Sequence, residues 1–184
     1  MRVITGAARG KPLETLPGDE VVRPTAERVK EGLFSAVQFY VPGARALDLF
    51  AGSGQLGIEA LSRGAQLCVF VDQSREAGEV VIRNLKYTGL FAKARVLTSD
   101  AARYIRYCKE TFDLIFLDPP YRHGTVAEIL PLVGDVTAPG GFVVCETERE
   151  AELADAYGAL ALHKRYRYGK TAIVIYRKPE EEAQ

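Results

Sequence analysis

The chain is 184 residues long, and its 24 basic and 24 acidic side chains give a formal net charge of zero. This length suits one domain with a well-buried core and excludes a second substrate-reading module of ordinary size. Because the net charge is zero, any affinity for nucleic acid must come from local patches of charge. No apolar run approaches the roughly 18 residues of a membrane span and no signal core opens the chain, so we expect a cytoplasmic protein.

An amphipathic helix is predicted first, over residues 21–40, where Val29, Leu33 and Val37 recur at four-residue spacing. Within one domain over residues 1–184, we expect an extension over residues 1–40, a core over 41–178 and a polar tail over 179–184. Strand-like and helical stretches alternate through the core. The predicted strands cover residues 44–47, 67–71, 94–97, 112–117 and 141–145, and the predicted helices cover residues 56–62, 75–87, 101–108 and 126–133.

This alternation of strands and helices predicts a doubly wound α/β sheet. Several of the strands are continuously apolar, as expected for parallel strands covered by helices on both faces. The C-terminal stretch departs from the pattern, because residues 160–168 and 171–176 form two predicted strands joined by a tight turn at Gly169-Lys170. We therefore expect a mostly parallel, Rossmann-like sheet of seven strands that ends in an antiparallel hairpin.

A glycine motif follows the first core strand. Gly52, Gly54 and Gly57 have the G-x-G-x-x-G spacing, which allows a tight strand-to-helix turn and a close approach of the backbone to a ligand. That spacing alone suits an NAD-binding enzyme equally well, and Asp72 falls at the distance of about 20 residues expected for a ribose-binding acid. Asp48 shifts the interpretation, because a carboxylate ahead of the glycines suits the cationic sulfonium and ammonium groups of S-adenosylmethionine.

A second motif, Asp118-Pro119-Pro120-Tyr121, directly follows the apolar run 112–117. A carboxylate, carbonyl groups fixed by two prolines and an aromatic ring are what is needed to hold a planar amine while an electrophile attacks its nitrogen. Asp118 and the Pro119 carbonyl would accept the N–H bonds of the amine, and Tyr121 would stack on the base, a contact worth about 1–3 kcal/mol. The alternative is a strand end and turn with a half-buried tyrosine, but the glycine motif in the same chain favours a methyl-acceptor clamp.

Carboxylates after two further strands complete the predicted cofactor site. We expect Asp72 to accept the ribose hydroxyls, the alternative being a helix N-cap for which Ser74 competes. Asp100 would contact the adenine amine together with the backbone of Ala101, or would cap the helix that follows. The predicted cofactor-binding residues are Asp48, Phe50, Ala51, Gly52, Ser53, Gly54, Gly57, Asp72, Gln73, Asp100, Ala101 and Asp118.

Two basic clusters are candidates for nucleic-acid contact through phosphates. We prefer the N-terminal one, because the apolar pattern does not require that segment for the core; its residues are Arg2, Arg9, Lys11, Arg23 and Arg28. In residues 163–170 basic side chains alternate with tyrosines, and RNA contact and a charged edge strand that resists aggregation explain this equally well.

His123 suits a substrate contact or a solvated loop. The three separated cysteines have neither zinc nor disulfide spacing, so we expect no metal.

The sequence closely resembles the bacterial 16S rRNA (guanine-N2) methyltransferase family over nearly its whole length. The resemblance rests on the opening residues 1–6 with Arg9-Gly10, on residues 23–25, on the glycine motif and on the Asp118 motif. Gln55 departs from the smaller or hydroxyl residue common in that loop. The resemblance implies a class I methyltransferase fold, S-adenosylmethionine as cofactor, and a monomer that acts on a guanine of 16S rRNA in an assembled or assembling small ribosomal subunit.

Three alternatives stay open at this point. A DNA adenine-N6 methyltransferase shares the clamp but usually needs a target-recognition region for which this length leaves little room. A protein glutamine methyltransferase more often carries Asn in place of Asp118. A non-catalytic cofactor-binding factor in ribosome assembly belongs to a different class altogether, and the intact Asp118 and Tyr121 speak against it.

Overall fold

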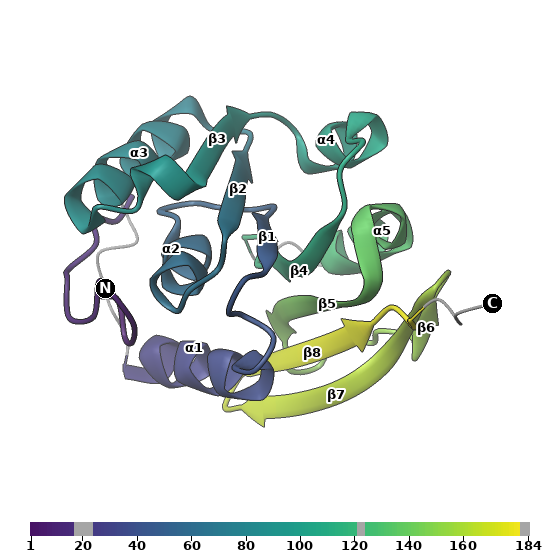
Figure 1. The fold of residues 1–184 in the computed structure, drawn as a ribbon. Helices are drawn as coiled ribbons and strands as arrows, with labels where there is room; N and C mark the ends of the chain where they lie inside the picture. The colour runs from purple at the N-terminus through teal and green to yellow at the C-terminus, as the bar shows by residue number, and fades with distance from the viewer. Residues whose placement is uncertain (17–23, 121–123, 181–184) are drawn as a thin grey trace.

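The fold is a single sheet with helices packed on both of its faces, as Figure 1 shows. The computed structural model describes residues 1–16, 24–120 and 124–180, without the side chains of residues 24–26. No helix within these ranges combines the length and apolar character that a membrane crossing requires.

The elements follow the alternation expected from the sequence, with ends shifted by a few residues. The helices are α1 Pro24–Val37, α2 Gln55–Ser62, α3 Arg75–Thr88, α4 Ala101–Tyr107 and α5 Thr125–Val133, with short 3-10 turns η1 Phe91–Lys93 and η2 Gly134–Val136. The strands are β1 Arg45–Asp48, β2 Leu67–Asp72, β3 Ala94–Thr98, β4 Phe112–Leu117, β5 Thr137–Glu148, β6 Ala156–Tyr157, β7 Leu160–Tyr168 and β8 Thr171–Arg177.

The sheet has the order β3-β2-β1-β4-β5-β8-β7-β6. The first five strands in this order pair in parallel, whereas β8 is antiparallel to both β5 and β7. This confirms the predicted doubly wound sheet with an antiparallel C-terminal hairpin. The described sheet has eight strands rather than seven, because the two-residue strand β6 pairs with the start of β7 and is too short to show a pattern in the sequence.

Two apolar clusters fill the space between the sheet and its helices. On one face α1, α2 and α3 pack with side chains such as Phe34, Ile58 and Leu85. On the other face α4 and α5 pack with side chains such as Ile105 and Leu130. Both faces of the central strands are therefore buried, which explains why these strands are continuously apolar.

The N-terminal segment, residues 1–16, belongs to the core, contrary to the expectation that the core does not require it. Val3, Ala8 and Leu13 are buried in the same cluster as α1 and α2. Their spacing follows neither a helix nor a strand period, so the pattern gives no sign of their burial.

A buried carboxylate on α2 holds this segment in place. Glu59 accepts hydrogen bonds from the backbone N–H groups of Ile4 (2.8 Å) and Thr5 (3.0 Å) and forms ion pairs with Lys30 (3.6 Å) and Arg63 (2.8 Å). Its side chain is fully buried, and Lys30 is 3% exposed. Burial lowers the pKa of Lys30, and Glu59 opposes that shift. Because the desolvation of two charges must be repaid by well-placed partners, these contacts work as one unit.

We expect Glu59→Gln to destabilise the fold by about 3–5 kcal/mol, because it leaves the buried Lys30 without its counter-charge. Equilibrium urea unfolding measures the loss. The matched control is Glu79→Gln, which removes an exposed ion pair to Arg75 and should unfold close to the wild-type midpoint. Equal midpoints for the two variants would contradict the assigned role of Glu59.

Candidate functional site

The carboxyl ends of β1, β2 and β4 meet at one edge of the sheet. Asp48 is the last residue of β1 and pairs with Phe116 of β4 on one side and with Phe70 of β2 on the other. Asp72 ends β2, and Asp118 directly follows β4. The chain order reverses between β1 and β4, and this reversal is where open α/β sheets bind ligands. The fold therefore brings these three of the four predicted carboxylates to the same edge.

The glycine loop between β1 and α2 has the backbone shape that its spacing predicts. Gly52 and Gly54 have positive φ angles of 51° and 81°, which L side chains adopt only with strain. Gly57 is needed for space instead: a Cβ there would lie 2.3 Å from Cε1 of Phe70 and 2.7 Å from Sγ of Cys68. The third glycine thus lets α2 pack closely against β2.

Asp48 is buried, although it lies at the sheet edge where the predicted site residues meet. Its residue is 1% exposed, and Oδ2 accepts the backbone N–H of Gly57 at 3.0 Å. Desolvation raises the pKa of Asp48 to about 7; the bond from Gly57 opposes this shift, and the nearby charge of Asp72 adds to it. Among the described residues, no ion pair balances this carboxylate.

Asp72 organises the loop from the end of β2. One carboxylate oxygen accepts the N–H of Gly52 at 2.9 Å, and the other accepts the N–H of Ser74 at 2.8 Å. Ser74 is the N-cap of α3, since its side chain accepts the N–H of Ala77. The alternative of Asp72 as the cap is therefore wrong, whereas its contact with ribose hydroxyls stays a prediction. Gln73 is exposed beside it.

Asp100 does cap the next helix. Its side chain accepts the N–H of Arg103 at 2.9 Å at the start of α4, and the residue is exposed while Ala101 is buried. Capping accounts for the presence of Asp100, and contact with an adenine amine stays a prediction for these two residues.

Asn84 on α3 supports the glycine loop, and the sequence did not single it out. Its side-chain N–H groups donate to the carbonyls of Ser53 (2.9 Å) and Glu14 (3.0 Å), and its oxygen accepts the N–H of Glu14 (2.8 Å). This buried amide joins the N-terminal segment to the cofactor loop. The available signal was an asparagine on the apolar face of α3, between Val80 and Thr88.

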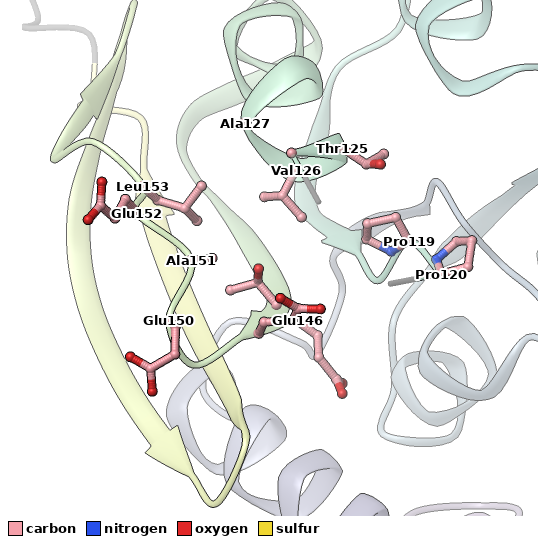
Figure 2. Close-up of a pocket in the computed structure, with 13 residues that line it drawn as sticks. Pro119, Pro120, Thr125, Val126, Ala127, Glu146, Glu150, Ala151, Glu152 and Leu153 are labelled. Carbon is pink, nitrogen blue, oxygen red and sulfur yellow. The ribbon is translucent and has the colours of Figure 1, made fainter. Parts of the chain in front are cut away.

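The clamp borders a pocket of about 340 Å³, shown in Figure 2. Asp118 is half-buried, Pro119 is buried and Pro120 is exposed. The predicted stacking residue Tyr121 and the neighbouring His123 lie outside the described residues. The pocket is lined by Pro119, Pro120, Gly124, Thr125, Val126, Ala127, Glu146, Thr147, Glu148, Glu150, Ala151, Glu152 and Leu153. The pocket lies beside the carboxyl ends of β4 and β5. The lining residues between Glu146 and Leu153 belong to none of the motifs found in the sequence.

The structure separates the basic residues that were expected to hold nucleic acid. Arg2 pairs with Glu27 at 3.3 Å, and the Lys11 ammonium donates to the carbonyls of Tyr87 (3.3 Å) and Thr88 (3.2 Å) at the end of α3. Because α3 begins at the site edge, Lys11 lies at the opposite edge of the sheet.

The other three expected nucleic-acid contacts differ in their positions. Arg9 follows Ala8, whose N–H donates to Ser62 at the end of α2, which places Arg9 at the edge opposite the site as well. Arg28 is exposed on α1. Arg23 lies outside the described residues.

The residues at the edge fit S-adenosylmethionine by the chemistry of their donors and acceptors. Within the part of the chain that the structure describes, no cation pairs with the buried Asp48 carboxylate, and the cofactor carries a sulfonium and an ammonium group. A Cβ on Gly52 would meet no atom within 4 Å, so the loop backbone there is open to a ligand, and Asp72 presents carboxylate oxygens at the end of the neighbouring strand. The pocket beside Pro119 lies next to this edge, where a methyl acceptor would enter.

Comparison with known proteins agrees with this geometry. The family model described as "Conserved hypothetical protein 95" matches residues 1–177. Over 183 residues the chain is 43% identical to "Putative rRNA methyltransferase YlbH" of Bacillus subtilis, covering 97% of this chain and 99% of that protein. It is 34% identical to "Ribosomal RNA small subunit methyltransferase D" of Escherichia coli, covering 97% and 90%. The solved structure "Putative methyltransferase yhhF from Escherichia coli" has a TM-score of 0.86 at 32% identity, covering 98% and 99%.

We expect the affinity for S-adenosylmethionine to rise with pH through about 7, because a cationic ligand prefers the ionised form of Asp48. Titration calorimetry between pH 5.5 and pH 8.5 measures it. Asp48→Asn keeps an acceptor for the Gly57 N–H and removes the charge, so its affinity should be lower at high pH and nearly independent of pH. Parallel pH profiles would show that Asp48 does not face the cofactor.

The cofactor-free protein gives an independent check on the same group. Because the folded-state pKa of Asp48 lies above its ordinary value of 3.8, the native state binds the additional proton between these pH values. The contribution of Asp48 to stability is therefore present at low pH and is lost as pH rises from about 4 to about 7. The difference in unfolding free energy between wild type and Asp48→Asn should shift in favour of Asp48→Asn over this interval.

Proposed function

This chain belongs to the bacterial 16S rRNA methyltransferase family described as conserved hypothetical protein 95, and we propose that it methylates the exocyclic N2 amine of one guanine in 16S rRNA. The methyl donor is S-adenosylmethionine, which supplies an electrophilic methyl group on a cationic sulfur. The observation that carries the proposal is the position of Asp118 and Pro119 directly after β4, at the sheet edge that also holds Asp48 and Asp72, with Pro119 lining the 340 Å³ pocket.

The acceptor amine needs alignment more than it needs a strong base. The lone pair of guanine N2 is delocalised into the ring, so the site must direct it toward the methyl group. The Asp118 carboxylate and the Pro119 carbonyl each accept one N–H of the amine, which leaves the lone pair aimed at the electrophile. Positioning of this kind supplies roughly 7–11 kcal/mol of a barrier. The methyl–sulfur bond breaks as the C–N bond forms, and the methylated amine is then acidic enough to pass its proton to the Asp118 carboxylate that already accepts an N–H from it.

The remaining site residues have supporting roles in this proposal. Asp48 balances the positive charge of the cofactor, the backbone of residues 50–54 lies along it, and Asp72 accepts its ribose hydroxyls. Gln73, Asp100 and Ala101 flank the adenine. Tyr121, which the structure does not describe, stacks on the target base. A base inside a duplex hides its amine, so the guanine must be unpaired or flipped when it enters.

Basic side chains at the site edge are the better placed of the two candidate RNA surfaces. Thr171 pairs with Glu148 at the end of β5 and with Tyr168 of β7, so the turn at Gly169 and Lys170 lies at the carboxyl edge. Arg167 and Lys170 are exposed there.

Arg28 of α1 belongs to the same region. An added Cβ on Gly32, one turn after Arg28, would lie 2.1 Å from the Tyr168 hydroxyl, so α1 packs against the end of β7. We propose that the protein acts as a monomer on an assembled or assembling small subunit, with Arg28, Arg167 and Lys170 near RNA phosphates.

We expect the wild-type protein to convert guanosine to N2-methylguanosine in unmodified small subunits or free 16S rRNA. Incubation with labelled S-adenosylmethionine, digestion to nucleosides and chromatography test this, with DNA as a parallel substrate. Label in N6-methyladenosine or in DNA would contradict the proposed activity. No label in any substrate, with intact cofactor binding, would favour a non-catalytic assembly factor.

In the same assay, Asp118→Ala should bind S-adenosylmethionine nearly as wild type does while its turnover falls by roughly 100-fold or more, because its hydrogen bonds matter most in the transition state. Asp135→Ala removes an exposed carboxylate in η2 and is the control. Near-wild-type turnover in Asp118→Ala would remove this residue from the mechanism.

We expect Arg167→Ala with Lys170→Ala to flatten the salt dependence of RNA binding, by about 0.7–0.9 in the log–log slope for each lost phosphate contact. Arg28→Ala should act in the same direction. Filter binding to 16S rRNA at several salt concentrations measures the slopes. Lys11→Ala should keep the wild-type slope and lower thermal stability, because Lys11 binds carbonyls at the end of α3. The reverse pattern would return the RNA surface to the N-terminal segment.

A further inference from the structure

The pocket beside the clamp has the size and the walls of a site for one planar base. Its volume of about 340 Å³ lies at the lower end of the range for small-molecule sites. Pro119 and Pro120 form one side, and the start of α5 and the segment that contains Ala151 and Leu153 form the others, as Figure 2 shows. Leu153 and Val126 are buried, so much of the lining is apolar.

One carboxylate in this lining lies beside the clamp. In the parallel pair of β4 and β5, Leu117 is opposite Cys145, so the next residues, Asp118 and Glu146, continue the two strands side by side. Glu146 is half-buried and lines the pocket. In Figure 2 it lies between the two prolines and the segment with Ala151. Glu148 is two residues further along β5, roughly 7 Å away.

We propose that Glu146 accepts the N1–H of the target guanine while Asp118 holds the adjacent N2 amine, so that Glu146 selects guanine by its Watson–Crick edge. This inference rests on the proposed guanine-N2 activity. Guanine presents two neighbouring donors, N1–H and N2–H, on that edge. Two neighbouring carboxylates, Asp118 just after β4 and Glu146 near the end of β5, are their complement.

The same arrangement rejects a purine that has the amine but lacks the N1 proton. In 2,6-diaminopurine the N2 amine is retained, whereas N1 is a bare acceptor. A carboxylate opposite that nitrogen places two acceptors face to face, with no proton between them. The buried Val126 and Leu153 offer no hydrogen bond in place of the missing proton, and two acceptors left facing each other at a half-buried carboxylate are costly.

The test compares two target bases in particles reconstituted on 16S rRNA. After the methylated guanine is mapped with wild-type enzyme, it is replaced by 2,6-diaminopurine in a ligated synthetic strand, and kcat/KM is measured for both particles. Wild type should prefer guanine by roughly 100-fold or more. Glu146→Gln should lower this preference at least about tenfold, because its amide also offers an N–H to a bare N1.

Two further variants keep the result specific to Glu146. Glu152→Gln changes an exposed carboxylate on the rim of the same pocket and should keep the wild-type preference. If Glu146→Gln has a lowered melting temperature, Glu146→Asp provides the same comparison, since its shorter side chain withdraws the carboxylate from N1.

The outcomes separate this inference from the activity on which it rests. An unchanged base preference in folded Glu146→Gln overturns the role of Glu146, as does a loss of preference that appears only in Glu148→Gln. Both results leave guanine-N2 methylation intact. A wild-type enzyme that forms no N2-methylguanosine overturns the proposed activity and the base-reading role together.

Discussion

The hydrogen bond from the Gly57 N–H to the buried carboxylate of Asp48 fixes the geometry on which the whole site depends. It joins the end of β1 to the first turn of α2 across the glycine loop, at 3.0 Å and without contact to solvent. Gly57 can take this position only because it lacks a side chain, since a Cβ would overlap Phe70 and Cys68. The glycine at residue 57 and the buried carboxylate of Asp48 therefore depend on each other.

The desolvation of Asp48 that this constraint imposes also makes the site suitable for a cationic ligand, such as the proposed cofactor. Burial raises the pKa of Asp48 to about 7, so without a cationic partner this carboxylate is only about half ionised near neutral pH. A ligand with fixed positive charge restores the ionised form, and part of its binding energy is spent on that ionisation. Asp72 shapes the loop through Gly52 and opposes the charge of Asp48, which increases the preference of this edge for a cation.

Sequence patterns predicted the parts of this structure that depend on local backbone chemistry. The glycine spacing, the strand-end carboxylates and the apolar strands each impose a requirement on neighbouring residues, and the doubly wound sheet followed from the alternation of strands and helices. The docking of residues 1–16 could not be predicted, because it depends on long-range bonds to Glu59 and on apolar residues without a period. The Glu146 side of the pocket escaped prediction for a similar reason, since it forms only when β5 pairs with β4.

The topology also shows how the basic and acidic side chains are distributed in a chain whose net charge is zero. Basic side chains have different surroundings at the two edges of the sheet, the one formed by the carboxyl ends of the parallel strands and the one opposite. At the edge opposite the site, Lys11 satisfies carbonyls at the end of α3, which leaves that ammonium group occupied within the fold. At the site edge, the exposed Arg167 and Lys170 lie near the pocket that Glu146 and Glu148 line. The positive charges of the hairpin attract a phosphate and the negative charges of the glutamates repel it, so these charges keep a phosphate out of the pocket without excluding an uncharged base. Under the proposed function, this division would let a small domain bind a polyanion at the hairpin while keeping the polyanion's backbone out of the acceptor pocket.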